Sequence, residues 1–191
     1  MKIVIDPGHG GKDSGAVNPK VGVQEKDLNL QIAIALQGWL AGAGHEVVMT
    51  RDDDRFLDLV LRASLSNYAN ADAFISIHCN AAGNPSAKGF EIWTSPGQTK
   101  ADSLATFIAQ AMQANFPKLV TRFDWNDGDL DREGNLAVLR LTKCPAVLVE
   151  AGFISNDDEA EWLQQIGTIQ NVAQAISLGV SIWATTRGGT A

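Results

Sequence analysis

Apolar residues recur along this chain with two different spacings, and the two spacings alternate. Six short apolar runs, most of them bounded by Gly, Pro, Asp or Asn, have the length and composition of strands. Between them, apolar positions recur every three to four residues, which is typical of amphipathic helices. The predicted strands are 3–5, 45–50, 74–78, 89–93, 136–139 and 146–150, and the predicted helices are 28–40, 57–68, 101–114, 157–165 and 169–184.

This alternation predicts the fold class. We expect a single α/β domain whose mostly parallel, twisted open sheet has about six strands, with helices on both faces. The run 89–93 alternates apolar and polar residues and is expected to be a half-exposed strand at a sheet edge. Residues 52–54 are three Asp residues that offer N-caps for the second helix. The folded domain is expected to cover 1–185, with 186–191 as a flexible tail or linker stub.

Composition narrows the function classes. The chain has 191 residues and a formal net charge of −7, and it contains no basic patch, which argues against nucleic-acid binding. No window approaches the ~18 apolar residues of a membrane span, so we expect no membrane insertion. The start, Met1 to Ile5, is interpreted as a strand and not as a signal peptide. The protein is therefore expected to reach its target through lysis or phage release, or after removal of a leader.

Aromatic residues and cysteines are interpreted as structural. The helix positions Trp39, Trp162 and Trp183 fall on apolar faces and are expected in the core. The two cysteines, Cys79 and Cys144, are too few for a disulfide scaffold. Cys79 follows a histidine that is a candidate metal ligand, but side chains alternate along a strand, so its thiol should point the other way. We expect both cysteines to be buried free thiols.

Four ionisable residues stand out by their position. His9 follows the first strand, His78 and Glu150 end two later strands, and Glu25 precedes the first helix. In an open parallel sheet, the carboxyl ends of the strands meet at one edge, where ligands bind. Two imidazoles and one carboxylate form the ligand set of a catalytic zinc that leaves a position open for water. Taken singly, each His is more often a satisfied or exposed histidine, and Glu25 a first-turn helix acid.

The motifs around these residues resemble a known family. The segments 5–11 (IDPGHGG), 50–51 (TR), 76–81 (SIHCNA) and 145–156 (PAVLVEAGFISN), together with Glu25, are similar to the zinc-dependent N-acetylmuramoyl-L-alanine amidases of bacterial cell walls and phage lysins. The resemblance covers about 1–184. It implies that His9, Glu25 and His78 bind one Zn²⁺ per chain and that Glu150 is the catalytic carboxylate.

The expected chemistry also follows from the residues. A Zn²⁺ ion with this ligand set lowers the pKa of its water and polarises an amide carbonyl. A second glutamate can accept the water's proton and return it to the leaving amine. Glu150 follows apolar residues in a partly desolvated setting that should raise its pKa. Asp6 is interpreted either as a partner that fixes the His9 ring or as a cap for the Gly-rich turn.

The resemblance implies cleavage between the lactyl group of N-acetylmuramic acid and the L-alanine of the stem peptide in peptidoglycan. The alternatives are another zinc hydrolase, such as a peptidase or deacetylase, and a catalytically inactive wall-binding module. The protein is expected to be a monomer that acts on the cell wall. Because a charge of −7 opposes attraction to anionic walls, a separate wall-binding domain is also expected.

Three remaining features are interpreted as secondary. His45 begins a strand at the edge opposite the site and is expected to be structural or solvated. The acidic stretch 124–131 lacks the Gly and Glu that an EF-hand requires. It is expected to be a polar loop near the site, with Trp125 and Arg132 as substrate contacts.

Overall fold

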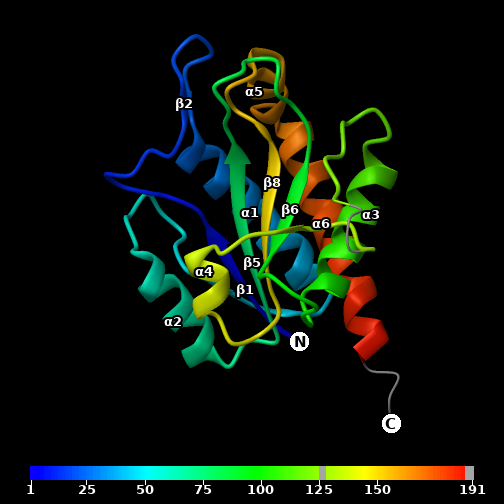
Figure 1. Cartoon of the computed structure of the whole chain (residues 1–191). Helices are drawn as coiled ribbons and strands as arrows, with labels where there is room; N and C mark the ends of the chain where they lie inside the picture. The colour runs from blue at the N-terminus through cyan, green and yellow to red at the C-terminus, as the bar shows by residue number, and fades with distance from the viewer. Residues whose placement is uncertain (125–127, 188–191) are drawn as a thin grey trace.

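A six-stranded sheet with the order β4-β1-β5-β8-β6-β7 forms the centre of the protein (Figure 1). The computed structural model describes residues 1–124 and 128–187. The first four strands in this order are parallel, β6 runs antiparallel to β8, and β7 runs parallel to β6. The sheet strands are β1 (Lys2–Pro7), β4 (Glu46–Met49), β5 (Ala73–Asn80), β6 (Glu91–Thr94), β7 (Arg132–Glu133) and β8 (Ala146–Phe153), and a small hairpin joins β2 (Val17–Asn18) to β3 (Val23–Gln24).

Helices cover both faces of the sheet, which confirms the predicted fold class. One face carries α1 (Glu25–Gly42), α3 (Asp102–Asn115) and α6 (Ile166–Arg187), and α6 packs against both α1 and α3. The other face carries α2 (Leu59–Ala69) and α4 (Ala137–Leu141), which lie in front of the sheet in Figure 1. The short helix α5 (Asp157–Leu163) follows β8 at the carboxyl edge of the sheet.

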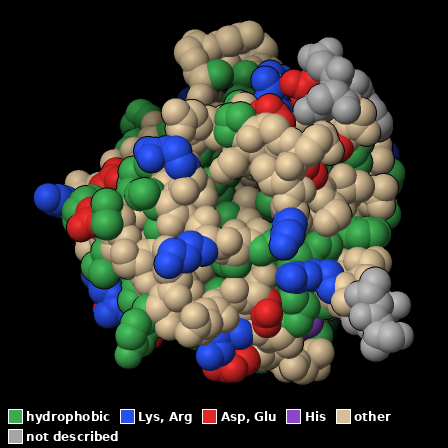
Figure 2. All heavy atoms as spheres, turned by 60° about the horizontal axis from the view of Figure 1, so that its bottom comes forward, with side chains coloured by type: hydrophobic (Ala, Val, Ile, Leu, Met, Phe, Trp, Pro, Cys, Tyr) green, Lys and Arg blue, Asp and Glu red, His purple; other side chains and the backbone are tan. Residues whose placement is uncertain are grey.

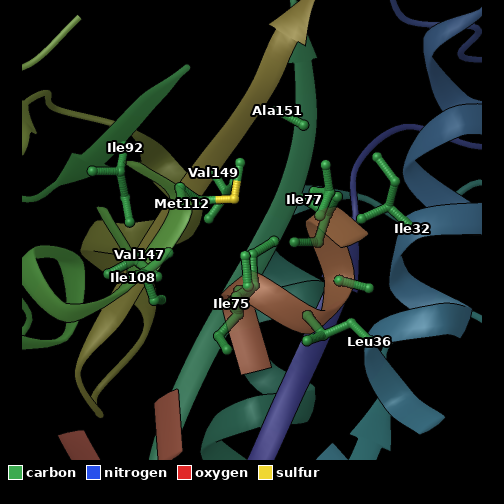
Figure 3. Close-up of a cluster of buried hydrophobic side chains, with 14 of the residues drawn as sticks. Ile32, Leu36, Ile75, Ile77, Ile92, Ile108, Met112, Val147, Val149 and Ala151 are labelled. Atoms are coloured by element: carbon green, nitrogen blue, oxygen red, sulfur yellow. The ribbon is translucent and has the colours of Figure 1, made fainter. Parts of the chain in front are cut away.

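Strict alternation along the central strands produces two cores. Ile75 and Ile77 point into the large core beneath α1, α3 and α6, as Figure 3 shows, whereas Phe74 belongs to the smaller core beneath α4. On β8, Val147 and Val149 likewise join the large core. Each such side chain contributes about 1.5–3 kcal/mol when fully buried. This alternation fixes the faces of the residues that follow, including the candidate site.

Three local predictions were wrong. Residues 137–139 belong to helix α4, with Leu136 as its N-cap, and do not form a strand. A run of four residues is too short for its periodicity to distinguish a strand from a helix, and β5 and β6 already occupy both sides of β8. Strand β6 is largely buried and is flanked by β7, so it is not the sheet edge. The N-cap of α2 is Asp58, which accepts a hydrogen bond from the Leu61 amide at 2.8 Å, and not one of the Asp residues at 52–54.

The aromatic and cysteine predictions had mixed outcomes. Trp183 is buried, as expected, but the side of α1 that carries Trp39 is open, and this residue is 40% exposed. Cys79 and Cys144 are both free, and Cys79 lies in the large core, away from the side of β5 that carries His78. Helix α6 continues to Arg187, two residues past the expected domain end, and 188–191 lie outside the described residues.

The surface agrees with the charge pattern of the sequence. On the face shown in Figure 2, Lys and Arg side chains are scattered singly among neutral and apolar groups. Within the ranges 1–124 and 128–187, none of the helices combines the length and the apolar character that a membrane span needs.

Candidate active site

His9, Glu25 and His78 come together at the carboxyl edge of the sheet. His9 lies in the loop after β1, Glu25 is the first residue of α1, and His78 lies near the end of β5. One ligand atom from each lies within 4.8 Å of the others. Glu25 Oε1 is 3.1 Å from His9 Nε2 and 2.9 Å from His78 Nδ1. The structure thus places the three predicted ligands in one cluster whose donor set suits a divalent cation.

Two glycines make room for this cluster. A Cβ on Gly8 would lie 2.2 Å from Cε1 of His78, so the imidazole packs directly on the Gly8 backbone. Gly15 has a φ of +63°, and a Cβ there would lie 2.5 Å from Oε2 of Glu25. His9 itself adopts a φ of 61°, a left-handed conformation that non-glycine residues rarely adopt. Such strain persists only where the surroundings hold the backbone firmly.

Two buried arginines hold the loop that carries His9. Arg51 is completely buried, and it donates hydrogen bonds to the carbonyl oxygens of Pro7 (2.9 Å) and Gly8 (2.8 Å). Arg62, on α2, donates to the carbonyl oxygens of Pro7 and His9, both at 2.6 Å. These charge-assisted bonds satisfy the backbone of a loop that belongs to neither a helix nor a strand. The TR motif therefore serves the geometry of the site.

Asp6 does not contact the ring of His9, contrary to one of its two predicted roles. Its carboxylate accepts hydrogen bonds from Arg62 Nη1 (2.8 Å), the Thr50 hydroxyl (2.6 Å) and the Ser76 hydroxyl (2.8 Å). Asp6 and Ser76 are register partners on β1 and β5, which explains their contact. Asp6 is the counter-ion of the buried arginine and links α2 to the sheet.

Asp13 makes the contact with the His9 ring that the sequence analysis proposed for Asp6. Its Oδ2 lies 2.9 Å from His9 Nδ1, and its Oδ1 accepts a hydrogen bond from the Gly15 amide at 3.1 Å. With Nδ1 bonded to a carboxylate, Nε2 of His9 is left facing Glu25 and available to a metal. The only sequence signal for Asp13 was its place four residues after His9.

The three candidate ligands are strongly coupled electrostatically. Burial raises the pKa of Glu25, but the hydrogen bonds from His78 and His9 outweigh it and hold this pKa well below its usual range. Burial lowers the pKa of His9, yet the bond and charge of Glu25 outweigh it and raise the pKa to about 9. Amides of Ala16 (2.9 Å) and Cys79 (3.3 Å) also donate to the Glu25 carboxylate. Glu25 is therefore ionised over the whole physiological range.

Glu150 lies next to this cluster. It is the register partner of His78 on the adjacent parallel strand, so both side chains project from the same face. Among the described residues, its buried Oε2 atom has no hydrogen-bond partner. Burial raises the pKa of Glu150 to about 7, and the charges of Glu25 and Glu91 add to this effect. A buried carboxyl that titrates near neutrality is suited to accept and return a proton.

The sequence analysis missed the residues on the far side of Glu150. Glu91, on β6, is the register partner of Glu150 and is buried. It accepts hydrogen bonds from Arg122 Nε at 2.6 Å and Asn80 Nδ2 at 2.9 Å. Arg122 lies just before the acidic stretch 124–131 that was expected to approach the site. Only their sequence neighbourhood, an acid in a strand and a base in a polar stretch, could have indicated them.

Arg132 and Trp125 were the residues expected to contact the substrate from this loop. The guanidinium of Arg132 lies on β7, 5.0 Å from the centroid of the Trp93 ring, as a cation–π contact. Trp125 falls outside the described residues.

His45 lies at the amino edge of the sheet, its Nε2 3.4 Å from the Ser181 hydroxyl, and burial lowers its pKa. This placement agrees with the structural interpretation of His45.

A groove opens at the cluster. It has a volume of about 830 Å³, and its lining includes His9, His78 and Asp58. Its other wall is the start of α2 and the segment before it, where exposed apolar side chains gather (Phe56, Leu59, Val60 and Leu61). This size is typical of ligand-binding clefts.

Known proteins are similar in sequence to this chain along nearly its whole length. The sequence profile of the N-acetylmuramoyl-L-alanine amidases matches residues 3–181. The amidase CwlM of Bacillus licheniformis is 37% identical over 95% of this chain and 68% of its own length. The endolysin of Bacillus phage SPP1 is 36% identical over 93% of this chain and 64% of its own length. This chain thus spans about two thirds of the length of these two relatives.

Solved structures give the same result. The amidase AmiC2 of Nostoc punctiforme superimposes with a TM-score of 0.88 at 31% identity, covering 97% of each chain. The catalytic domain of CwlV from Bacillus (Paenibacillus) polymyxa superimposes with a TM-score of 0.84 at 33% identity, covering 96% of this chain and 98% of that domain. From the profile match, the relatives and the shared fold, this chain belongs to the N-acetylmuramoyl-L-alanine amidase family.

Proposed function

We propose that this chain hydrolyses the amide between the lactyl group of N-acetylmuramic acid and the L-alanine of the stem peptide in peptidoglycan. The observation that carries the proposal is the adjacency of Glu150, with its unpartnered buried oxygen, to the His9–Glu25–His78 cluster. A hydrolase of this kind needs a cation site beside a proton-transfer group, and the family supplies the substrate class.

The donor set fits one Zn²⁺ ion. Two imidazole nitrogens face one carboxylate oxygen, and Asp13 orients the His9 ring from behind. When bound there, zinc supplies Lewis-acid polarisation of the scissile carbonyl and lowers the pKa of a water molecule. Glu25 and the two histidines would hold the ion, while Cys79 lies in the core and takes no part.

Glu150 carries the proton transfers in this proposal. Its carboxylate accepts a proton from the attacking water and then returns it to the nitrogen of the leaving L-alanine. The buried setting that raises its pKa to about 7 makes both transfers possible at neutral pH. Arg122 and Asn80 hold Glu91 in place beside Glu150, where its charge contributes to the raised pKa of Glu150.

The groove beside the site accommodates a polymer segment. Its apolar wall at the start of α2 suits the methyl groups of an alanine-containing peptide. In this proposal the protein acts on the cell wall as a monomer. Its relatives are longer than this chain, which supports a separate wall-binding domain.

The decisive experiment is a product analysis. Purified peptidoglycan is digested with the zinc-loaded chain, and new amino-terminal L-alanine and new reducing sugar are both measured. Amino-terminal alanine without reducing sugar is expected. Cleavage within the peptide or release of acetate would instead favour a peptidase or a deacetylase, and intact peptidoglycan would favour a wall-binding module.

Matched variants test the assigned roles. Glu150→Gln should retain zinc and lose at least 100-fold in turnover, because both proton transfers use this carboxylate. His78→Ala should lose the metal. Glu161→Gln, an exposed carboxylate on α5, is the control and should keep full activity. Turnover of Glu150→Gln above a tenth of the wild-type value would exclude it as the proton-transfer group.

A further inference from the structure

Trp39 is an exposed aromatic residue far from the candidate active site. It lies on α1, fourteen residues after Glu25, which corresponds to about 21 Å along the helix axis. Its side chain is 40% exposed. The indole Nε1 donates a hydrogen bond to Gln170 Oε1 of α6 at 3.3 Å, so the ring is held in place. Helices α1 and α6 lie together on the same face of the sheet (Figure 1).

The surface is hollowed on both sides of this ring. One hollow, of about 590 Å³, lies between the end of α1, α6 and the end of α3. The other, of about 440 Å³, lies beside the middle of α1 and reaches Gln170. Trp39 and Gly38 line both hollows. The indole therefore stands as a ridge in the middle of a recessed surface.

Packing does not explain the glycine at position 38. A Cβ built there would meet no atom within 4 Å, and its backbone is helical. Glycine inside an exposed helix is less stable than alanine, because it loses more backbone freedom on folding. The absent side chain does have one effect: it leaves the space on both sides of Trp39 open.

The residues that line the two hollows carry no charge. Lys, Arg, Asp and Glu are all absent from both linings, although the whole chain has 15 basic and 22 acidic residues. The polar groups around the ring are side-chain amides and hydroxyls, namely those of Gln31, Gln170, Gln174, Asn115, Ser177 and Ser181. A half-exposed indole offers its face to C–H groups, and amides and hydroxyls both donate and accept hydrogen bonds. These are the groups that recognise an uncharged sugar.

We propose that the surface around Gly38 and Trp39 is a second binding site, which takes the sugar units of a glycan strand. The choice of this polymer rests on the proposed function, because the substrate of that reaction is built on such strands. A site about 21 Å from Glu25 along α1 holds the enzyme on the polymer while the active site works elsewhere on it. Binding at two places on one polymer raises the effective concentration at the active site. Since the lining is uncharged, this binding is insensitive to salt.

A binding assay without turnover tests the proposal. The zinc-loaded Glu150→Gln chain is mixed with insoluble glycan strands from which the peptides have been removed, and the bound fraction is measured by sedimentation. Trp39→Ala should weaken binding at least tenfold, and Trp39→Phe should retain most of it. Gly38→Leu fills the hollows with a good helix former and should also weaken binding tenfold without loss of fold. Tyr68→Ala removes an exposed aromatic on α2 and should change nothing.

A second readout separates this site from the active site. In the otherwise unchanged chain, Trp39→Ala and Gly38→Leu should lower activity on whole walls and leave kcat/KM on a single disaccharide–peptide unchanged. Equal glycan binding by the wild type and both variants would overturn the proposal. So would a wild-type dimer that Trp39→Ala dissociates, since the surface would then be an interface between copies. Glycan binding through Trp39 in a chain without amidase activity would refute the proposed function alone.

Discussion

The imidazole of His78 rests on the backbone of Gly8, and a Cβ on Gly8 would lie 2.2 Å from its Cε1 atom. No side chain fits there unless the ring moves. This contact joins the loop after β1 to the end of β5 and sets the position of one of the three proposed metal ligands.

Gly8→Ala should therefore weaken zinc binding and spare the fold. The methyl group displaces the His78 ring from Glu25, and the loss of such orientation typically costs 10- to 100-fold in metal affinity. Zinc affinity is measured by competition with a chromogenic chelator, and the fold by circular dichroism. Gly83→Ala is the matched control, because a Cβ there meets no atom within 4 Å. Unchanged affinity in Gly8→Ala would show that the ring does not depend on this contact.

The pH profile of activity should have an acidic limb set by Glu150. This carboxyl must be ionised to accept a proton, and its pKa is about 7 in the metal-free chain, first because of burial and then because of Glu25 and Glu91. A bound cation favours the ionised form, so the limb in kcat/KM should lie at or below about pH 7. Glu91→Gln removes a neighbouring negative charge and should move the limb to lower pH. Glu133→Gln, on the adjacent β7, is the control. If the acidic limb of Glu91→Gln stays at the same pH or moves to higher pH, the electrostatic coupling between Glu91 and Glu150 is contradicted.

The metal-free chain should lose stability as the pH rises from about 6.5 to 9. Burial lowers the pKa of His9 but Glu25 outweighs it, so the folded value is about 9 against an unfolded value of 6.5. A raised folded pKa stabilises the protein fully below pH 6.5, and this contribution disappears as the pH rises through 9. The full contribution amounts to at most about 3 kcal/mol. It is measured by urea unfolding in chelator at several pH values.

His9→Gln is the control for this pH dependence. It removes the titrating imidazole and should flatten the profile between pH 6.5 and 9. A wild-type stability that is constant or increases over this interval would contradict the electrostatic coupling between His9 and Glu25.

Arg62→Met should be strongly destabilising, by about 3–5 kcal/mol. Arg62 is 2% exposed, and its loss leaves the buried Asp6 carboxylate without this counter-ion and removes the hydrogen bonds that Arg62 donates to the carbonyl oxygens of Pro7 and His9. The free energy of unfolding is measured by chemical denaturation. Arg55→Met breaks only exposed ion pairs with Asp52 and Asp53 and should change it by less than about 0.5 kcal/mol. Similar small losses in both variants would show that Arg62 is not essential to the loop.

The sequence by itself was sufficient for the plan of the fold and for the expectation that His9, Glu25, His78 and Glu150 lie together. Alternation between strand and helix periods predicts the layers, because each period exposes an apolar face that must be covered. His9, His78 and Glu150 could be placed together because parallel strands end at one edge, and Glu25 because its helix starts there.

The tertiary structure decided which side chains surround these residues. Asp6 lies near the end of β1 and Asp13 lies in the loop that follows it, and only the position of Arg62 on α2 determines that Asp6 pairs with Arg62 while Asp13 bonds His9. The position of Glu91 beside Glu150 depends on β6 pairing antiparallel to β8. Such contacts join segments far apart in the chain, and hydrophobic periodicity carries no information about them. The exposure of Trp39 has the same origin, because a helix pattern marks an apolar side but not the extent to which α6 covers it.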